Sequence, residues 1–255
     1  ISTAFALTVN TDVATANVFN SGQAYTPGGT DRVNTLQDED NLTGSGVNPT
    51  LNATLGNAGD NGDIIITPKL NGIETVNVAF TGSGATAVRA LDLQDASGLK
   101  AANVSRISEA VNSAEVGNIR DAIADMSLSN TQANQGGTME FSFASGVLAG
   151  ENSGKVSLNN VSISVLNIGQ NTSGIAARGV GINGYENLTI ESKGAANTVS
   201  VANLPMDSGT NGKITITGDQ ALNLSSSSTT VNAVTPSLVE ATRYDGGIQG
   251  NYGRL

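Results

Sequence analysis

One short pattern, in which apolar residues alternate with polar ones, recurs along this chain. It occupies residues 73–80, 99–104, 185–190 and 238–244. Alternation with a period of two residues is typical of a β-strand that buries one face. The first two copies begin 26 residues apart and the last two 53 apart, about twice that spacing. A repeat of roughly 20–30 residues is expected when each repeat forms one coil of a stacked fold. The pattern therefore predicts an all-β chain, either an elongated β-solenoid-like strand stack or an irregular β-sandwich.

The composition agrees with tightly stacked strands. Charged residues make up 13% of the 255 residues and hydrophobic residues 38%, while small polar residues and 31 glycines fill the remainder. Further strands are expected at residues 64–66, 138–143, 155–158, 161–168, 198–201 and 213–217. One short helix is expected at about residues 114–126, where apolar residues fall three or four positions apart, namely Val116, Ile119, Ile123 and Met126.

The chain divides into three expected regions: an N-terminal strand segment (residues 1–20), an acidic turn-rich β region (21–110) and a second β region with the helix at its start (111–255). In the first region, residues 1–10 alternate as one strand. A strand of this kind can complete the sheet of a neighbouring copy. We therefore expect the N-terminal strand to be exchanged between subunits, although a first strand within its own domain is the more common arrangement. The candidate assembly residues are Ile1, Phe5, Leu7 and Val9.

The composition also limits the chemistry. The chain has no His and no Cys, so the commonest general base and all thiolate chemistry are missing. The net charge of −10 argues against a nucleic-acid partner, which requires clustered Lys and Arg. No apolar stretch approaches the ~20 residues of a membrane span. We expect no enzyme activity and no membrane insertion. Because the chain begins at Ile1 rather than Met, we also expect it to be a piece of a longer product.

Two short motifs suggest enzymes but lack the required context. Residues 179–184 spell the glycine-rich GxGxxG of dinucleotide sites, yet the residues after them predict a strand where that site needs a helix. Ser97 and Lys100 have the SxxK spacing of penicillin-binding enzymes, but the companion SDN and KTG motifs are absent. Paired carboxylates beside aromatic residues could act on glycosides, and the best such pairs are Tyr185–Glu186 and Tyr244–Asp245.

Four segments of the first hundred residues share motifs with one family. They are residues 7–12 (LTVNTD), 40–44 (DNLTG), 55–65 (LGNAGDNGDII) and 72–78 (GIETVNV). In these segments the chain resembles bacterial surface-layer and RTX-type calcium-binding secreted proteins. The resemblance implies a secreted, calcium-stabilised coat or fibre protein that associates with copies of itself.

Calcium is the expected cofactor, because acidic and amide oxygens cluster in turns that could hold a hard cation. The candidate ligands are Asp60 and Asp63 in one turn, and Asp38 and Asp40 with Asp31 in another. The alternative is that these residues are ordinary turn residues, favoured there for backbone reasons.

The sequence as a whole predicts an extracellular structural protein, a self-assembling subunit of a surface layer, fibre or filament at a bacterial surface or on a phage particle. Its partners are expected to be copies of itself, with cell-surface polysaccharide as a further partner. The alternative is a β-solenoid adhesin or phage fibre that binds or cleaves polysaccharide.

Overall fold

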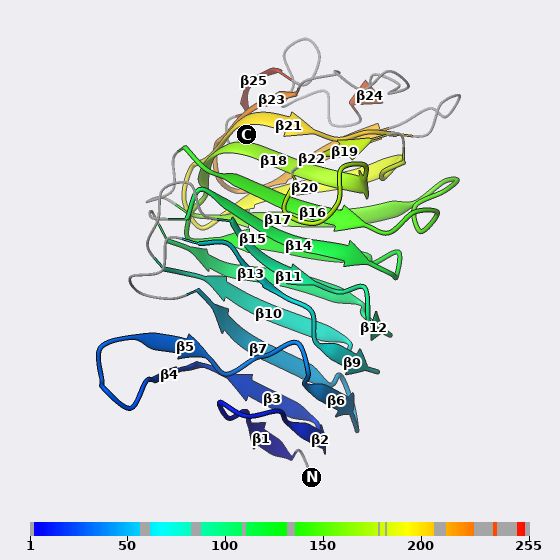
Figure 1. Ribbon diagram of the computed structural model, residues 1–255. Helices are drawn as coiled ribbons and strands as arrows, with labels where there is room; N and C mark the ends of the chain where they lie inside the picture. Colours follow the sequence, from blue (N-terminus) through cyan, green and yellow to red (C-terminus); the bar gives the residue numbers. More distant parts are fainter. Residues whose placement is uncertain are drawn as a thin grey trace.

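The computed structural model describes residues 3–56, 62–82, 88–108, 111–131, 136–177, 179–181, 183–206, 213–226, 237–238 and 249–252. The chain winds into a β-solenoid whose coils stack from β1 near the N-terminus to β25 near the C-terminus (Figure 1). Neighbouring coils pair in parallel along three sheets, apart from the last pair of strands in the second sheet, which is antiparallel. The predicted all-β solenoid is confirmed.

Sheet I is the longest and holds ten strands in the order β1 (Ala4–Ala6), β3 (Val18–Ser21), β7 (Thr50–Leu55), β10 (Thr75–Phe80), β13 (Ala101–Ile107), β15 (Asp125–Ser129), β17 (Ser153–Asn159), β20 (Asn187–Lys193), β22 (Lys213–Gly218) and β24 (Ser237–Leu238). Its inward side chains form one buried stack from coil to coil. Members in register include Phe19, Leu51, Val76, Ala102, Met126, Val156, Ile190 and Ile216.

Sheet II lies on the other side of the core and contains β8 (Ile64–Ile66), β11 (Val88–Asp92), β14 (Ser113–Ile119), β16 (Thr138–Phe143), β18 (Ser162–Asn171), β21 (Asn197–Asn203), β23 (Leu222–Ser226) and β25 (Gln249–Tyr252), with β19 (Val180–Gly181) paired to β18. Leu91, Val116, Phe141 and Ile168 are in register and buried. Each of these coils thus contributes inward apolar side chains to the common core.

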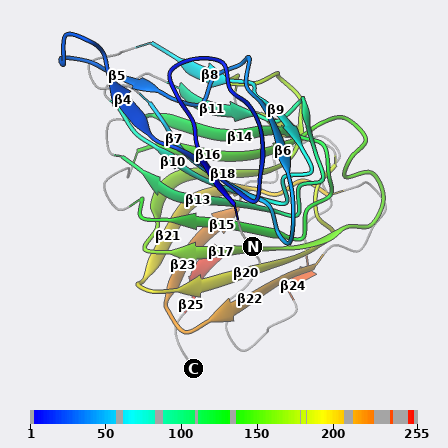
Figure 2. The same ribbon diagram turned by 90° about the horizontal axis from the view of Figure 1, so that it is seen from below.

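Sheet III closes the third side of the N-terminal coils, with strands β2 (Val13–Ala16), β6 (Asn41–Gly44), β9 (Lys69–Asn71) and β12 (Ala96–Ser97). A hairpin of β4 (Gln23–Tyr25) and β5 (Arg32–Asn34) leaves the stack after β3. Figures 1 and 2 both show it projecting from the body of the molecule. Across the ranges that the structure describes, no helix has the length and apolar character needed to span a bilayer.

The helix predicted at about residues 114–126 is wrong, because strands β14 and β15 occupy this stretch. The apolar residues behind the prediction are all buried, but in different elements. Val116 and Ile119 lie in β14 on either side of a shift in register, Ile123 lies between the two strands, and Met126 begins the next inward row. The buried apolar residues of an irregular strand, a corner and a second strand therefore happen to have the three- to four-residue spacing that is typical of a helix.

Candidate functional site

A ladder of carboxamides follows the outer face of sheet I. Asn52 donates from Nδ2 to Oδ1 of Asn20 (3.0 Å), Asn77 donates to Asn52 (2.9 Å), and Asn103 donates to Asn77 (2.9 Å). Ser127 continues the row by donating from Oγ to Asn103 (2.7 Å). Asn52, Asn77 and Asn103 each use one of their two N–H groups within the ladder, and Asn20 only accepts, so the row has further donor and acceptor capacity for a ligand.

Three ladder residues, Asn20, Asn52 and Asn77, line an open groove of about 460 Å³ beside the place where the chain leaves β3 for the hairpin. The lining residues are neutral and come from four neighbouring strands and the residue after β3: Asn20, Ser21, Gly22, Asn52, Ala53, Thr54, Asn77, Ala79 and Ser105. The groove therefore offers hydrogen bonds without charge. It has no aromatic ring for a sugar to stack on among these lining residues.

The predicted calcium ligands lie in different environments. Asp40 is fully buried, and its carboxylate accepts hydrogen bonds from the backbone N–H groups of Asp12 and Gln37 (2.8 Å each). Burial raises the pKa of Asp40, while these two hydrogen bonds act in the opposite direction. The Asp40 carboxylate therefore already satisfies backbone donors.

Two of the other acidic candidates also accept backbone hydrogen bonds from neighbouring coils. Asp38 accepts from the N–H of Thr67 (2.7 Å), and Asp63 accepts from the N–H of Val88 (2.9 Å). Asp31 is exposed at the hairpin, and Asp60 lies outside the described residues. Within the described part of the chain, no three acidic side chains come together as a metal site.

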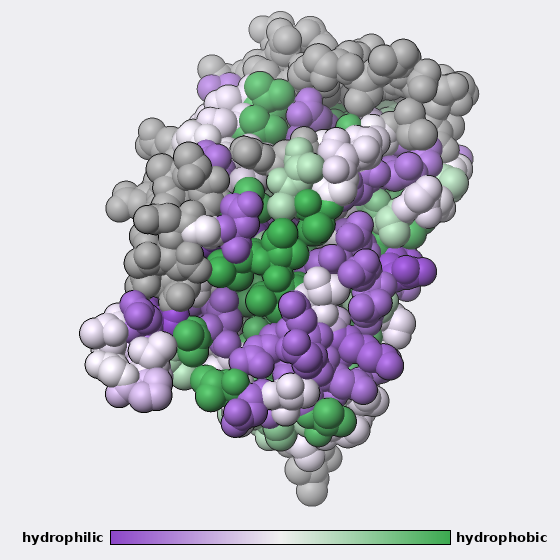
Figure 3. Space-filling view, in the orientation of Figure 1, coloured by the Kyte–Doolittle hydropathy of each residue, from purple (hydrophilic) through white to green (hydrophobic). Residues whose placement is uncertain are grey.

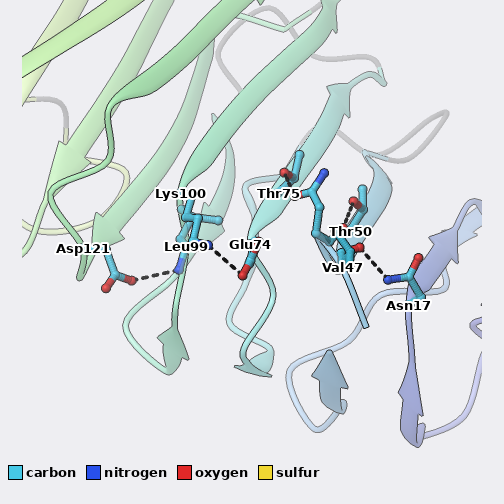
Figure 4. Close-up of polar contacts among 9 residues, drawn as sticks. Asn17, Val47, Thr50, Glu74, Thr75, Leu99, Lys100 and Asp121 are labelled. Atoms are coloured by element: carbon cyan, nitrogen blue, oxygen red, sulfur yellow. Dashed lines mark hydrogen bonds and ion pairs between the residues drawn. The ribbon is translucent and has the colours of Figure 1, made fainter. Parts of the chain in front are cut away.

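The corner that leads into sheet I joins successive coils through polar contacts, drawn in Figure 4. Asn17 donates to the carbonyl of Val47 (2.9 Å), and Thr75 donates to Oδ1 of Asn48 (2.7 Å). Lys100 forms an ion pair with Glu74 (2.8 Å), so the lysine of the SxxK motif pairs with an acid of the preceding coil.

Sequence reasoning missed a pair of buried carboxylates on the outer face of sheet II. Glu115 in β14 and Glu140 in β16 are in register on adjacent strands, and neither side chain is exposed. Ser142 donates to Glu115 (2.7 Å), and Asn167 donates to Glu140 (2.8 Å). Burial and the neighbouring Glu140 raise the pKa of Glu115 to about 7. The sequence feature that could have revealed this pair is its spacing, because the two glutamates lie one coil repeat apart.

The N-terminal strand is shorter than predicted. β1 ends at Ala6, because Thr8 turns the chain by hydrogen-bonding to Asp12 (2.7 Å from N to Oδ2). Phe5 is half-buried and packs on Phe19 with ring centroids 6.2 Å apart. Leu7 is buried, whereas Val9 is 47% exposed. Ile1 lies outside the described residues.

The remaining motifs take structural positions. The GxGxxG stretch contains β19, which returns antiparallel to β18, and β20 follows it where the dinucleotide motif would need a helix. Tyr185 is buried and donates to the carbonyl of Ile123 (2.5 Å), and Glu186 is buried and accepts from the N–H of Asn152 (2.7 Å). Tyr244 and Asp245 lie outside the described residues.

Hydrophobic residues gather in the middle of the face seen in Figure 3, between hydrophilic regions. In the described part of the chain, the exposed large hydrophobic side chains lie in the first third of the sequence: Val9, Val13, Tyr25, Val47 and Ile65. Val13 is 75% exposed and lies in β2, the outermost strand of sheet III. The N-terminal end of the solenoid therefore combines outermost strands with exposed apolar side chains.

Comparison with known proteins adds no family to this description. No protein-family model matches the sequence. No curated protein and no solved structure matches it either. The chain is thus described by its β-solenoid fold and by the surfaces above.

Proposed function

We propose that this protein is an extracellular structural protein whose copies assemble into a surface layer, fibre or filament at a bacterial surface or on a phage particle. The observation that carries the proposal is the outermost position of β1. Among the described strands, β1 pairs only with β3, so its other edge is open. An open strand edge is a template for pairing with another chain.

The hydrogen bonds between β1 and β3 determine which backbone groups face the open edge. Leu7 donates to the carbonyl of Asn20, and Val18 donates to the carbonyl of Thr3. Because neighbouring residues of a strand direct their backbone groups to opposite sides, Ala4 and Ala6 direct theirs to the open edge. Both alanines are exposed. A strand from a second copy would pair here.

A proline at Ala6 tests this pairing directly. Proline removes the N–H that faces the open edge and leaves the pairing with β3 in place. We expect Ala6→Pro to reduce assembly in sedimentation velocity and electron microscopy, with an unchanged circular dichroism spectrum. The matched control is Ala6→Val, which retains the N–H and is expected to assemble normally. Equal assembly of both variants, or a wild-type chain that stays monomeric under all conditions, would overturn the proposal.

The carboxamide groove on sheet I favours a second candidate function, the binding of a neutral polysaccharide. The rungs of the ladder follow the spacing of neighbouring strands, about 4.8 Å, so a chain of sugars lying across the strands would meet similar groups at each rung. Binding of insoluble polysaccharides by the wild type, lost in Asn77→Ala, supports this candidate. Release of new reducing ends would instead indicate a cleaving enzyme.

A further inference from the structure

The coil that contains β2 and β3 contributes no strand to sheet II. The chain of this coil runs from β3 of sheet I to β6 of sheet III, and between them the hairpin of β4 and β5 takes the place of a sheet II strand. Sheet II begins one coil later with β8, which among the described strands pairs only with β11. Figure 2 shows the hairpin and β8 on the same side of the molecule. The other edge of β8 is therefore an open strand edge.

Ile65 presents the backbone hydrogen-bonding groups of this edge. It lies opposite Ala90 in the parallel pairing with β11. The N–H of Val88 is directed toward the preceding coil, and Ala90 has the same direction because alternate residues of a strand direct their backbone groups to the same side. In a parallel pair, Ala90 then bonds the two neighbours of Ile65, so the N–H and C=O groups of Ile65 face the open edge. The next donor on this edge, the N–H of Thr67, is already bonded to Asp38 (2.7 Å).

A groove of about 320 Å³, which we call the β8 groove, lies along this edge. It is lined by β5 of the hairpin, by β8 and by the segment that leads from the hairpin to β6: Val33, Asn34, Leu36, Gln37, Asp38, Glu39, Ile64 and Ile66. All eight residues lie in the described part of the chain. Half of them are aliphatic, so the β8 groove can accept apolar side chains beside the backbone groups of Ile65.

The polar part of the lining is acidic. Asp38 and Glu39 are both exposed, and Asp38 lies beside Thr67, just after the end of β8. Among the residues that the structure describes, neither carboxylate forms an ion pair. The lining residues include no Lys or Arg. Two uncompensated carboxylates therefore favour a partner with a basic side chain at this place and disfavour an acidic one.

We propose that the β8 groove binds an extended, basic peptide segment of another protein, which adds a strand to sheet II. Main-chain hydrogen bonds to Ile65 hold the segment, and pockets for alternate side chains give specificity, as in other cases of strand addition. Apolar side chains of the segment lie beside Ile64 and Ile66, and a Lys or Arg pairs with Glu39. The site is separate from the open edge of β1, so this inference goes beyond the proposed function and does not depend on it.

Fluorescence anisotropy with synthetic peptides tests this inference. The probe is a labelled peptide in which two lysines flank the sequence Val-Ser-Val-Ser-Val at each end, and the control peptide carries two glutamates at each end instead. We expect saturable binding of the lysine peptide, weakened by added salt, and no binding of the glutamate peptide. Equal binding of the two peptides, or binding of neither, would refute the proposed partner.

Variants of the edge separate this site from the general attraction of a basic peptide to a chain of net charge −10. Ile65→Pro removes the N–H on the open edge and keeps the pairing with β11, so we expect about tenfold weaker binding. The matched control Ile65→Val retains the N–H and should bind as the wild type. Glu39→Gln should weaken binding about two- to fivefold. Glu151→Gln, at an exposed glutamate outside the groove, should have no effect.

Two further measurements keep the test decisive. Circular dichroism checks that Ile65→Pro retains the fold, and Glu39→Gln carries the test if it does not. Unchanged affinity in a folded Ile65→Pro, or in Glu39→Gln, would place the peptide elsewhere and refute the proposal. If the lysine peptide does not bind and Ile65→Pro abolishes self-association in sedimentation velocity, the partner is a second copy and the proposed one is wrong. Ala6→Pro should bind the lysine peptide normally, which keeps this test apart from that of assembly through β1.

Discussion

The Oδ1 atom of Asp40 lies 2.8 Å from the backbone nitrogen of Asp12, which occupies the equivalent corner of the preceding coil. Asp12 and Asp40 each come directly before a strand of sheet III, β2 and β6. The same relationship recurs at other corners, where Asp121 accepts from the N–H of Leu99 (3.0 Å) and Asn197 accepts from the N–H of Val161 (2.7 Å). Acidic and amide side chains therefore join one coil to the next by satisfying backbone groups at the corners.

This role predicts the effect of removing the Asp40 carboxylate. Asp40→Ala leaves the N–H groups of Asp12 and Gln37 without their acceptor, and each unsatisfied buried donor costs about 1–3 kcal/mol. We expect the free energy of unfolding to fall by about 2–4 kcal/mol in urea titrations. The matched control Asp31→Ala, at an exposed hairpin residue, should change it little. Equal effects of the two substitutions would show that the corner contact contributes nothing to stability.

The carboxamide ladder predicts coupling between its rungs. Asn77 donates to Asn52 and accepts from Asn103, so Asn77→Ala removes two hydrogen bonds and should cost about 1–2 kcal/mol. In a double-mutant cycle, Asn52→Ala and Asn77→Ala should couple by at least about 0.5 kcal/mol. Thr54→Ala, on the same strand as Asn52, is the control and should be additive with Asn77→Ala. Additivity in both cycles would contradict an energetic role for the ladder.

The raised pKa of Glu115 predicts a pH dependence of global stability. The pKa is raised from 4.5 to about 7, so between these values the folded chain holds a proton that the unfolded chain has lost. Stability from this group is therefore fully present below pH 4.5 and is lost as the pH rises toward 7. The loss is at most about 3 kcal/mol. Comparison of unfolding free energies of the wild type and Glu115→Gln across this range isolates the effect, and parallel curves would exclude it.

Calcium remains a prediction from the sequence, and its test is separate from that of assembly. If calcium binds, excess Ca²⁺ should raise the melting temperature in a concentration-dependent way, because a ligand bound only by the folded state stabilises it. A chelator should reverse the shift, and Mg²⁺ serves as the control cation. Since Asp63 already accepts a hydrogen bond from Val88, Asp63→Asn shows whether that carboxylate contributes to binding. Isothermal titration calorimetry without measurable heat in excess Ca²⁺ would remove calcium from the proposed function.

Strand positions could be predicted from the sequence because alternation reports directly on the buried face. The strand predicted at residues 138–143 coincides with β16, and that predicted at residues 213–217 matches β22 within one residue. The helix prediction failed at β14, where residues of both faces are buried. Ile175 and Ala176 contact the outer face there, so Glu115 and Gly117 are buried and do not mark that face as solvent-exposed.

The roles of the acidic residues could not be predicted, because their partners come from other coils. Asp38 and Asp40 are two residues apart in sequence, yet Asp38 accepts a hydrogen bond from the N–H of Thr67 and Asp40 accepts one from the N–H of Asp12. Which backbone N–H group meets each carboxylate depends on the register between coils. That register is set by how many residues each connecting loop contains, and alternation within a strand does not report it.

The number of residues in each coil varies, although the strands of successive coils still pair with one another. Ladder residues of sheet I are 24, 25 or 26 apart in the regular coils and 32 apart where the hairpin intervenes. On sheet II, the hydrogen-bonded pair Asn167 and Asn203 is 36 apart. Extra residues therefore form loops that project from the side of the solenoid, and the spacing between successive coils does not change. The exposed turn at residues 27–30 of the hairpin is for this reason a natural grafting point, where a foreign peptide could be displayed at a fixed height along a rigid axis.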